Sequence, residues 1–248
     1  MTLPIALQLW SVKEDAELDF FGTLEKVAKM GYDGVEFAGY YGKSASEIKA
    51  VLNKLGLKAA GAHVSADQIL HQIDDVIAFE TELGNKYIVC PWANFNSLEE
   101  WKEFAEQLQH SGKKLSEAGL SLVYHNHAHE LVAVENEYIL DILLNAVPSN
   151  LLKAELDAYW LEFAGVDAVE FMSKYKGRTP LIHVKDMAQS KEESTEIGNG
   201  IMNIKGIVQQ AKLNSVEWLI VEQEAFTKPQ LVSVEIGLNN LKKILAEA

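Results

Sequence analysis

The sequence predicts a single barrel of eight parallel strands, each followed by a helix, that spans residues 1–248. One pattern recurs along the chain: an amphipathic helical stretch ends at a glycine and a short β-rich run follows, as in KMGYDGVEF, KLGLKAAGAHV, ELGNKYIVCPW and EAGLSLVYHN. A glycine just past a helix end supplies the left-handed residue that turns the chain towards the next strand. No Pro/Gly/Ser-rich linker or run of charges interrupts this alternation, so one domain is expected.

Eight short segments are predicted as strands because they are rich in apolar residues and are bounded by turn residues. In chain order these segments are Ile5–Ser11, Gly34–Phe37, Lys58–Val64, Tyr87–Pro91, Leu120–Asn126, Leu152–Leu156, Pro180–Lys185 and Trp218–Glu222. The stretches between them repeat their apolar residues at helical spacing. The predicted helices are Phe20–Met30, Ser46–Leu55, Ala66–Leu83, Leu98–Ala118, Glu137–Ala146, Ala168–Tyr175, Ile204–Leu213 and Gln230–Ala246.

The connections between the strands decide the topology. Short right-handed crossovers make consecutive strands parallel, and eight such units close into a (β/α)₈ barrel. The alternative is an open doubly wound sheet. A dinucleotide-binding sheet of that kind needs a glycine-rich turn after its first strand, and LQLWSVKEDAEL contains no glycine. The barrel is therefore the expected fold.

Composition restricts the class of protein. Hydrophobic residues make up 48% of the chain and charged residues 23%, and no apolar run approaches the roughly 20 residues that cross a bilayer. The start, MTLPIALQLWSV, lacks the basic segment and cleavage site of a signal peptide, so a cytoplasmic protein is expected. The single cysteine, Cys90, fits a reducing compartment and is expected to be buried. A formal net charge of −14 disfavours nucleic acid as a partner and suits small neutral substrates.

Titratable side chains stand at the carboxyl ends of the predicted strands, where barrels of this kind place their reactive groups. These residues are Glu36, His63, His125, His127, Asp157, His183, Lys185, Glu222 and Glu224. Residues two apart share one face of a strand. The same-face pairs are His125 with His127, Glu155 with Asp157, His183 with Lys185, and Glu222 with Glu224. Burying this many charges is costly unless a metal ion or a substrate compensates them, so a functional site is expected.

Other polar residues are expected to have structural roles. His71 and His110 lie in predicted helices and should be solvated, and His129 should lie in a loop. Ser65 and Asp186 are expected to cap a helix or to stabilise a turn.

The types of donor atom indicate a metal site. Carboxylates and imidazoles without a cysteine thiolate suit Mn²⁺, Co²⁺, Fe²⁺, Zn²⁺ or Mg²⁺. Oxygen and nitrogen coordination with open positions is typical of a catalytic metal, whereas a structural zinc is closed by four ligands. One divalent metal ion is therefore the expected cofactor.

Six motifs follow one another in an order that resembles a known family. They are GYDGVEF, LVYHNHAHE, AELDAYW, IHVKD, IGNGIMNI and LIVEQE, and the resemblance covers nearly the whole chain. The arrangement resembles the sugar-phosphate isomerase/epimerase group, the xylose-isomerase-like barrels. The resemblance implies an enzyme that acts on a small carbohydrate. Neither nucleic acid nor a membrane is an expected partner, because the net charge is −14 and no apolar run is long enough to cross a bilayer. Relatives often associate as dimers or tetramers, so a homo-oligomer is one expectation.

The resemblance also implies one divalent metal, held by a carboxylate from strand five, an aspartate from strand six, a histidine from strand seven and a glutamate from strand eight. By position, three of these ligands fall on Asp157, His183 and Glu222. The fourth departs from the family pattern, because His125 stands where many members have a glutamate. Either His125 takes this position or Glu130 reaches back from the following loop. Glu130 is the expected ligand, because it keeps the carboxylate that the pattern requires.

This departure affects the expected reaction. The family's epimerases use two glutamates on opposite faces of the substrate, from strands five and eight, and here one of the two is replaced by histidine. Relatives with YHNH look more like dehydratases or lyases that act on keto-sugars and inososes. The prediction is a metal-dependent sugar isomerase or epimerase that works through an enediolate, and the alternative is a metal-dependent lyase or dehydratase.

The roles of single residues follow from this scheme. The expected general base is His127 or Glu224, since an imidazole with a pKa of about 6.5 is suited to neutral pH. Lys185 would hold a substrate oxygen or the developing negative charge. The expected substrate-binding residues are Glu36, His63, His125, Trp10 and Trp92, the two tryptophans by packing on a sugar ring.

Two other classes of protein stay open. A metal-dependent endonuclease for abasic DNA shares this barrel, but it normally needs a cluster of metals and a basic groove, which the net charge disfavours. A sugar-binding or regulatory protein with a decayed site is the other class. The presence of Asp157, His183 and Glu222 argues against such decay.

Overall fold

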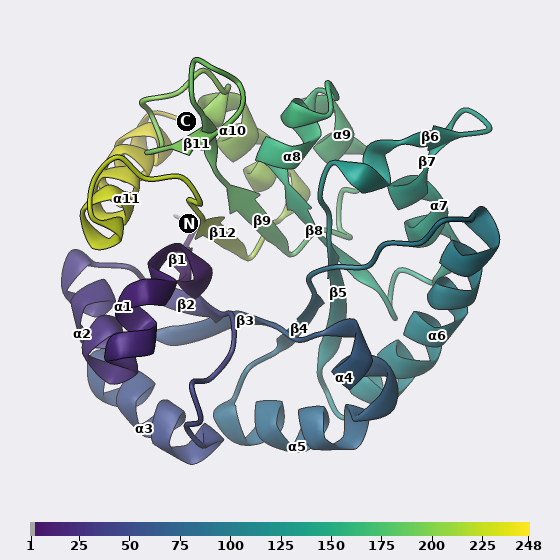
Figure 1. Ribbon diagram of the computed structural model, residues 1–248, viewed down its shortest axis with the longest axis horizontal. Helices are drawn as coiled ribbons and strands as arrows, with labels where there is room; N and C mark the ends of the chain where they lie inside the picture. The colour runs from purple at the N-terminus through teal and green to yellow at the C-terminus, as the bar shows by residue number, and fades with distance from the viewer. Residues whose placement is uncertain (1–2) are drawn as a thin grey trace.

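A closed barrel of eight parallel strands forms the centre of the protein, as a computed structural model of residues 3–248 shows (Figure 1). The barrel strands are β1 (Ile5–Gln8), β2 (Gly34–Phe37), β3 (Lys58–His63), β4 (Tyr87–Cys90), β5 (Ser121–His125), β8 (Lys153–Asp157), β9 (Leu181–Val184) and β12 (Trp218–Val221). Strand β1 pairs in parallel with both β2 and β12, so the sheet has no open edge. The predicted barrel is confirmed, and the open sheet is excluded.

The helices form a ring around the barrel (Figure 1). They are α1 (Lys13–Leu18), α2 (Phe20–Met30), α3 (Ala45–Leu55), α4 (Ala66–His71), α5 (Ile73–Leu83), α6 (Leu98–Glu117), α7 (Ile139–Ala146), α8 (Ala158–Phe163), α9 (Ala168–Lys174), α10 (Ile204–Asn214) and α11 (Gln230–Glu247). Two 3₁₀ turns and two small hairpins complete the loops. These are η1 (Leu9–Val12), η2 (His129–Leu131), β6 (Ala133–Val134) with β7 (Glu137–Tyr138), and β10 (Asp186–Met187) with β11 (Ser194–Thr195).

Several segments differ from the predicted elements. Strand β1 ends at Gln8 instead of Ser11, because Oε1 of Gln8 accepts a hydrogen bond from the backbone N–H of Trp10 and the chain turns into η1. The predicted helix 66–83 is divided into α4 and α5 at Gln72, whose φ of −129° is not helical. The sequence pattern does not predict α1 and α8, because six residues are too few to show a helical repeat.

The core has two layers that follow the alternation of side chains along the strands. The outer layer lies between strands and helices and contains Leu7, Val35 and Leu156. The inner layer fills the barrel itself with Ala6, Ala60, Tyr87, Val89, Val123, Leu181 and Ile220. These apolar side chains fill the barrel below the polar strand ends, and this inner layer is called the apolar floor.

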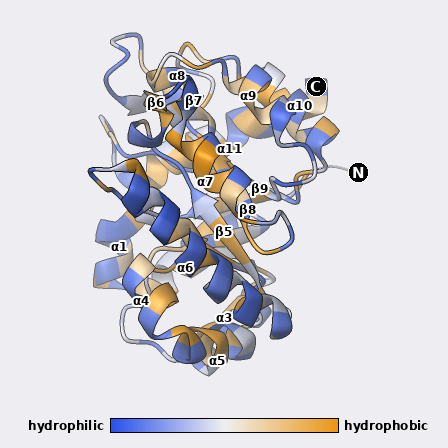
Figure 2. Cartoon of the chain, turned by 90° about the vertical axis from the view of Figure 1, so that its right-hand side faces the viewer, coloured by the Kyte–Doolittle hydropathy of each residue, from blue (hydrophilic) through white to orange (hydrophobic). Residues whose placement is uncertain are grey.

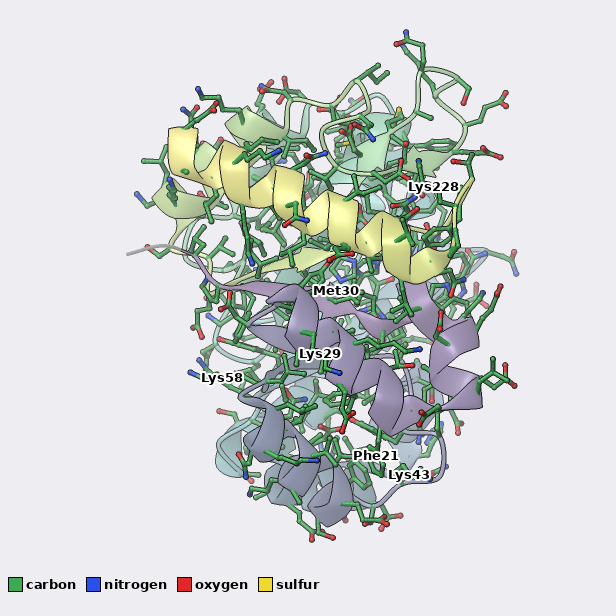
Figure 3. The ribbon with its side chains drawn as sticks, turned by 90° about the vertical axis from the view of Figure 1, so that its left-hand side faces the viewer. Phe21, Lys29, Met30, Lys43, Lys58 and Lys228 are labelled. Carbon is green, nitrogen blue, oxygen red and sulfur yellow. The ribbon has the colours of Figure 1, made fainter. Side chains whose placement is uncertain are left out.

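The helices present their apolar side to the barrel and their charged side to solvent. In Figure 2, α7 is mostly orange, in agreement with its buried Leu140, Leu143 and Leu144. Figure 3 shows α11 lying across the outer face beside α2, and the labelled Lys29 and Lys58 are exposed there. Within residues 3–248, no helix combines the length and the apolar character needed to cross a membrane.

Replacing Leu156 with alanine tests how strongly the outer core layer supports the barrel. Leu156 is fully buried on β8, so the truncation should lower the free energy of unfolding by about 2–5 kcal/mol. Leu213 in α10 is 61% exposed, and Leu213→Ala should change stability by at most about 0.5 kcal/mol. Urea denaturation of both variants measures the difference. Equal losses would contradict this assignment of the core.

Candidate metal centre

Titratable side chains from six barrel strands gather above the apolar floor. They are Glu36, His63, His125, His127, Glu155, Asp157, His183, Lys185, Glu222 and Glu224. A cavity of about 520 Å³ opens above them. Its wall includes Trp10, His63, Ser65, Gln68, Trp92, His125, His127, Glu222 and Glu224. The convergence predicted from the strand ends is therefore present in the structure.

One group of four side chains offers nitrogen and oxygen donors within 4.8 Å of one another: His125, Asp157, His183 and Glu222. Oδ1 of Asp157 accepts a hydrogen bond from Tyr159 N at 2.8 Å and thus caps α8, which leaves Oδ2 directed into the group. Nδ1 of His183 lies 3.0 Å from Oε2 of Glu222. Burial, with His183 and His127 nearby, lowers the pKa of His125 well below its ordinary value, so this imidazole is neutral and has a lone pair to offer.

The ammonium group of Lys185 lies among the carboxylates of this group. Its Nζ is 3.0 Å from Oδ2 of Asp157, 2.7 Å from Oε2 of Glu222 and 3.1 Å from Oε2 of Glu224. The side chain is buried and is not part of the cavity wall, so its charge compensates the carboxylates beneath the cavity. Its expected contact with a substrate oxygen stays a prediction. Burial opposes its charge, but Asp157 and Glu222 keep the pKa of Lys185 above its ordinary value.

A deeper group lies on the other side of His183. Its members His63, His125, Glu155 and His183 also place donor atoms within 4.8 Å of one another. Nε2 of His63 lies 3.1 Å from Oε2 of Glu155 and 3.3 Å from Oε2 of Glu36. Burial opposes the imidazolium, yet Glu36 and Glu155 raise the pKa of His63 to about 9. Burial and the neighbouring Glu36 raise the pKa of Glu155 to about 7.

Glu155 was visible in the sequence only as the same-face partner of Asp157, with no role attached to it. The alternation along β8 places both side chains inside the barrel, one above the other. Gln8, which contacts Glu36, and Trp160, whose ring lies 5.5 Å from that of His127, were not among the predicted site residues. The predicted first strand continued to Ser11, so Gln8 stood in its middle and the sequence did not mark it as a strand-end residue.

Glu130 does not reach the donor groups found among residues 3–248. Its Oε1 accepts a hydrogen bond from the hydroxyl of Tyr124, and its Oε2 accepts one from the backbone N–H of His127, both at 2.8 Å. Tyr124 lies on the outer face of β5 in the core, so the carboxylate is held there and shapes the loop after the strand. Of the two alternatives for the strand-five ligand, the geometry favours His125.

Glu36 occupies a different place from the expected one. It was expected to bind substrate hydroxyls across the cavity, but its side chain is fully buried below the wall. There its Oε2 accepts hydrogen bonds from Gln8 and His183. The reason is the closure of the barrel, which brings β1, β2 and β9 around one point at this depth.

The cavity wall combines aromatic rings with two acid–base groups. Trp92 is 51% exposed and Trp10 is 44% exposed, so both offer ring surface to a ligand. His127 packs against Trp92, with 4.8 Å between ring centroids, and burial together with Lys185 lowers the pKa of His127 to about 3. At neutral pH His127 is therefore a neutral imidazole. For Glu224, burial raises the pKa of the carboxyl group, and the positive charge of Lys185 acts in the opposite direction.

The loop after β9 fixes the position of Glu224. Oγ of Ser194 accepts a hydrogen bond from the backbone N–H of Glu224 at 2.9 Å. The same loop is held by Asp186, whose carboxylate accepts hydrogen bonds from Gly198 N and Gly200 N at 2.8 and 3.0 Å. The expected turn role of Asp186 is confirmed, as is the helix-capping role of Ser65 at α4.

Several buried polar atoms of the site have no hydrogen-bond partner among the described residues. They are Oε1 of Glu36, Oε1 of Glu155 and Nδ1 of His125, and Oδ2 of Asp157 has only its close ion-pair contact with Nζ of Lys185. An unsatisfied buried group costs about 1–3 kcal/mol, and more when it is charged. Oxygen and imidazole donors at this spacing are the ligands that divalent ions such as Mn²⁺ or Zn²⁺ accept. The residues present therefore fit a divalent metal ion.

Comparison with known proteins places this chain in a family. Residues 24–244 match the family model of the xylose isomerase-like TIM barrel. The chain belongs to this family. The resemblance found in its motifs is thereby confirmed.

Curated proteins that resemble this chain include inosose dehydratases. An inosose dehydratase of Clostridium perfringens is 30% identical over 154 residues, which cover 62% of this chain and 47% of that protein, so the match spans about half of the dehydratase. An inosose dehydratase of Bacillus cereus is 25% identical over 273 residues, covering 99% of this chain and 85% of the relative.

Two solved structures show the same fold. A sugar phosphate isomerase/epimerase from Parabacteroides distasonis superposes with a TM-score of 0.87 at 22% identity, covering 99% of this chain and 96% of the other. The IOLI protein with a bound zinc atom superposes with a TM-score of 0.80 at 14% identity, covering 100% and 99% of the two chains. At these identities the structures establish the fold alone.

Replacing Lys185 with methionine tests whether its charge compensates the buried carboxylates. In a metal chelator, Lys185→Met should lower the free energy of unfolding by about 3–5 kcal/mol, because Asp157 and Glu222 lose their buried counter-charge. Added Zn²⁺ should restore part of the loss, since the ion would supply positive charge to the same oxygens. The matched control is Lys174→Met, which removes a half-exposed partner of Asp141 and should cost about 0–1 kcal/mol. Wild-type stability of Lys185→Met in chelator would refute the assignment.

Proposed function

We propose that this protein is a metal-dependent dehydratase that removes water from a keto-sugar or an inosose. The observation that carries the proposal is the unequal pair of acid–base groups at the cavity wall: one carboxylate, Glu224, at the end of β12, and one neutral imidazole, His127, after β5. Elimination of water needs one group that removes a proton and returns it to the leaving hydroxyl. The inosose dehydratases among the relatives support this choice.

A divalent ion would be held by Asp157, His183 and Glu222, with His125 as the ligand from the fifth barrel strand. These four side chains offer one donor atom each within 4.8 Å of one another. When bound, the ion would supply Lewis acidity to the carbonyl group of the substrate and favour its enolisation. Lys185 would remain close by as a second positive charge.

Glu224 is the proposed general base. Its carboxylate lines the cavity, and burial raises its pKa, which makes it a stronger base than an ordinary glutamate. It takes the proton from the carbon next to the carbonyl, and the electron pair of that C–H bond forms the enediolate. The β-carbon–oxygen bond then breaks, Glu224 returns the proton to the departing hydroxyl, and water leaves with an α,β-unsaturated ketone as the product.

His127 and the tryptophans position the substrate in this scheme. A neutral imidazole donates one hydrogen bond without adding charge, so His127 can hold a hydroxyl or the oxygen on which negative charge develops. Trp10 and Trp92 offer exposed rings for packing against the apolar face of a sugar or cyclitol. The ring of Trp10 is also covered by Nζ of Lys13, 3.9 Å from its centroid, which fixes the indole.

Epimerisation or isomerisation is the second candidate, and the same enediolate would serve it. Epimerisation needs a second base on the opposite face of the substrate, and His127 is the candidate for that role because it lies at the other side of the barrel end from Glu224. Its pKa of about 3 makes it a weak base, which favours dehydration over epimerisation.

The test uses the manganese-loaded protein, a panel of keto-sugars and inososes, and D₂O, with products followed by NMR. Dehydration predicts an unsaturated ketone and release of water from one panel member. Glu224→Gln should reduce the rate by about 10²–10⁴-fold, because the proposed proton transfer is lost. Glu192→Gln, on the exposed part of the β10–β11 hairpin, is the matched control and should keep full activity.

Other outcomes would contradict the proposal. Recovered substrate with inverted configuration and deuterium at the inverted carbon, without an unsaturated product, would identify an epimerase. No exchange with any panel member, in a protein that binds no metal, would remove the enzyme hypothesis.

A further inference from the structure

The two nitrogens of His183 face different layers of the site. Nδ1 lies 3.0 Å from Oε2 of Glu222 in the upper donor group, whereas Nε2 lies 2.7 Å from Oε2 of Glu36 in the deeper layer. His183 and Glu36 are both fully buried, so the contact between them is shielded from solvent. The group that holds a proton on one nitrogen of this imidazole therefore determines which nitrogen can act as a ligand in the upper donor group.

A chain of hydrogen bonds with fixed polarity ends at Nε2 of His183. The backbone N–H of Trp10 can only donate, and it donates to Oε1 of Gln8 at 3.0 Å. The amide of Gln8 must then turn its NH₂ group to Glu36, and Nε2 of Gln8 donates to Oε2 of Glu36 at 2.7 Å. An ionised Glu36 only accepts, so the contact to His183 requires a proton on Nε2. Nδ1 faces Oε2 of Glu222, so without a metal ion both nitrogens can carry a proton. A ring that gives up one proton while Nε2 keeps its donor contact to Glu36 has its lone pair on Nδ1.

The backbone around Glu36 keeps its carboxylate beside Nε2 of His183. The pairing between β2 and β3 shifts register between Val35 and Glu36, an irregularity of the kind that re-aims side chains near active sites. Opposite Glu36 stands Gly61, where a Cβ atom would lie 2.6 Å from Oε1 of Glu36. A larger residue at position 61 would leave no room for the carboxylate of Glu36 in its observed place. Nε2 of His63 lies closer to Oε2 of Glu155, at 3.1 Å, than to Oε2 of Glu36, at 3.3 Å. His63 therefore does not take the place of His183 beside Glu36.

We propose that Glu36, oriented by Gln8, is a positioning residue that keeps the proton of His183 on Nε2 and presents Nδ1 to a metal ion held with Asp157 and Glu222. The inference rests on the proposed metal site and assigns Glu36 a role other than binding substrate hydroxyls. Metal-ligating histidines generally donate their second N–H to such a partner, and loss of the partner weakens metal binding by about 10–100-fold.

The first experiment uses the wild-type chain. Protein with ¹⁵N-labelled imidazoles is loaded with Zn²⁺, and long-range ¹H–¹⁵N spectra report the state of each ring nitrogen, with His183→Ala to assign the signals. The expected result is a protonated Nε2 and a zinc-bound Nδ1 for His183. A zinc-bound Nε2 would overturn the inference.

The second experiment measures zinc affinity and stoichiometry by titration calorimetry. Glu36→Gln should bind one zinc ion about 10–100-fold more weakly than wild type and should alter the His183 signals. The control is Glu80→Gln, a buried carboxylate hydrogen-bonded to Asn85 outside the site, which should leave zinc affinity unchanged.

The outcomes separate this inference from the proposed function. Wild-type affinity in Glu36→Gln would overturn the role of Glu36 and leave the metal site intact. Two zinc ions in wild type and one in Glu36→Gln would also overturn it, because Glu36 would then be a direct ligand. Absence of zinc binding in wild type would overturn the metal site and the inference together. If Glu36→Gln does not fold, the wild-type spectrum decides.

Discussion

The burial of several carboxylates at one end of the barrel is the constraint on which the rest of the site depends. Glu36, Glu155 and Asp157 are fully buried, and Glu222 is nearly so. Such a set is stable only with nearby positive charge. Lys185, His63 and His183 supply part of this charge from inside the barrel, and a divalent ion would supply the rest. The apolar layer below them keeps water out, which strengthens each of these interactions.

Residues that contact no substrate hold this charged layer in place. Asp157 is fixed by capping α8 and by its backbone N–H, which donates to Oδ1 of Asn126. Glu130 shapes the loop that carries His127, and Ser194 holds the backbone of Glu224. The loops above the barrel therefore place the proposed acid–base groups, whereas the strands place the proposed metal ligands. This division allows one barrel to support different reactions, as the names of its relatives illustrate.

The sequence was sufficient for the barrel and for the convergence of its strand ends, because both follow from period-two alternation and from glycines at helix ends. It was insufficient wherever a side chain reached out of its own element. The bond from Trp10 N to Gln8, which ends β1, is a local side-chain-to-backbone bond that period-two alternation does not show. The bond from Tyr124 to Glu130 holds the carboxylate beside the outer face of β5, which the loop sequence does not show either. The sequence also does not show how deeply a strand-end residue is buried. Glu36 and Glu222 both stand at strand ends, but the closed barrel buries Glu36 below the cavity and places Glu222 at its wall.

The central claim is that Asp157, His183 and Glu222 hold one divalent ion. Anomalous diffraction at the zinc edge, from crystals grown with Zn²⁺, tests it most directly. We expect one strong peak per chain, about 2.0–2.2 Å from Oδ2 of Asp157, Nδ1 of His183 and Oε2 of Glu222. A peak centred between His63 and Glu155, or no peak at the end of the barrel, would contradict it.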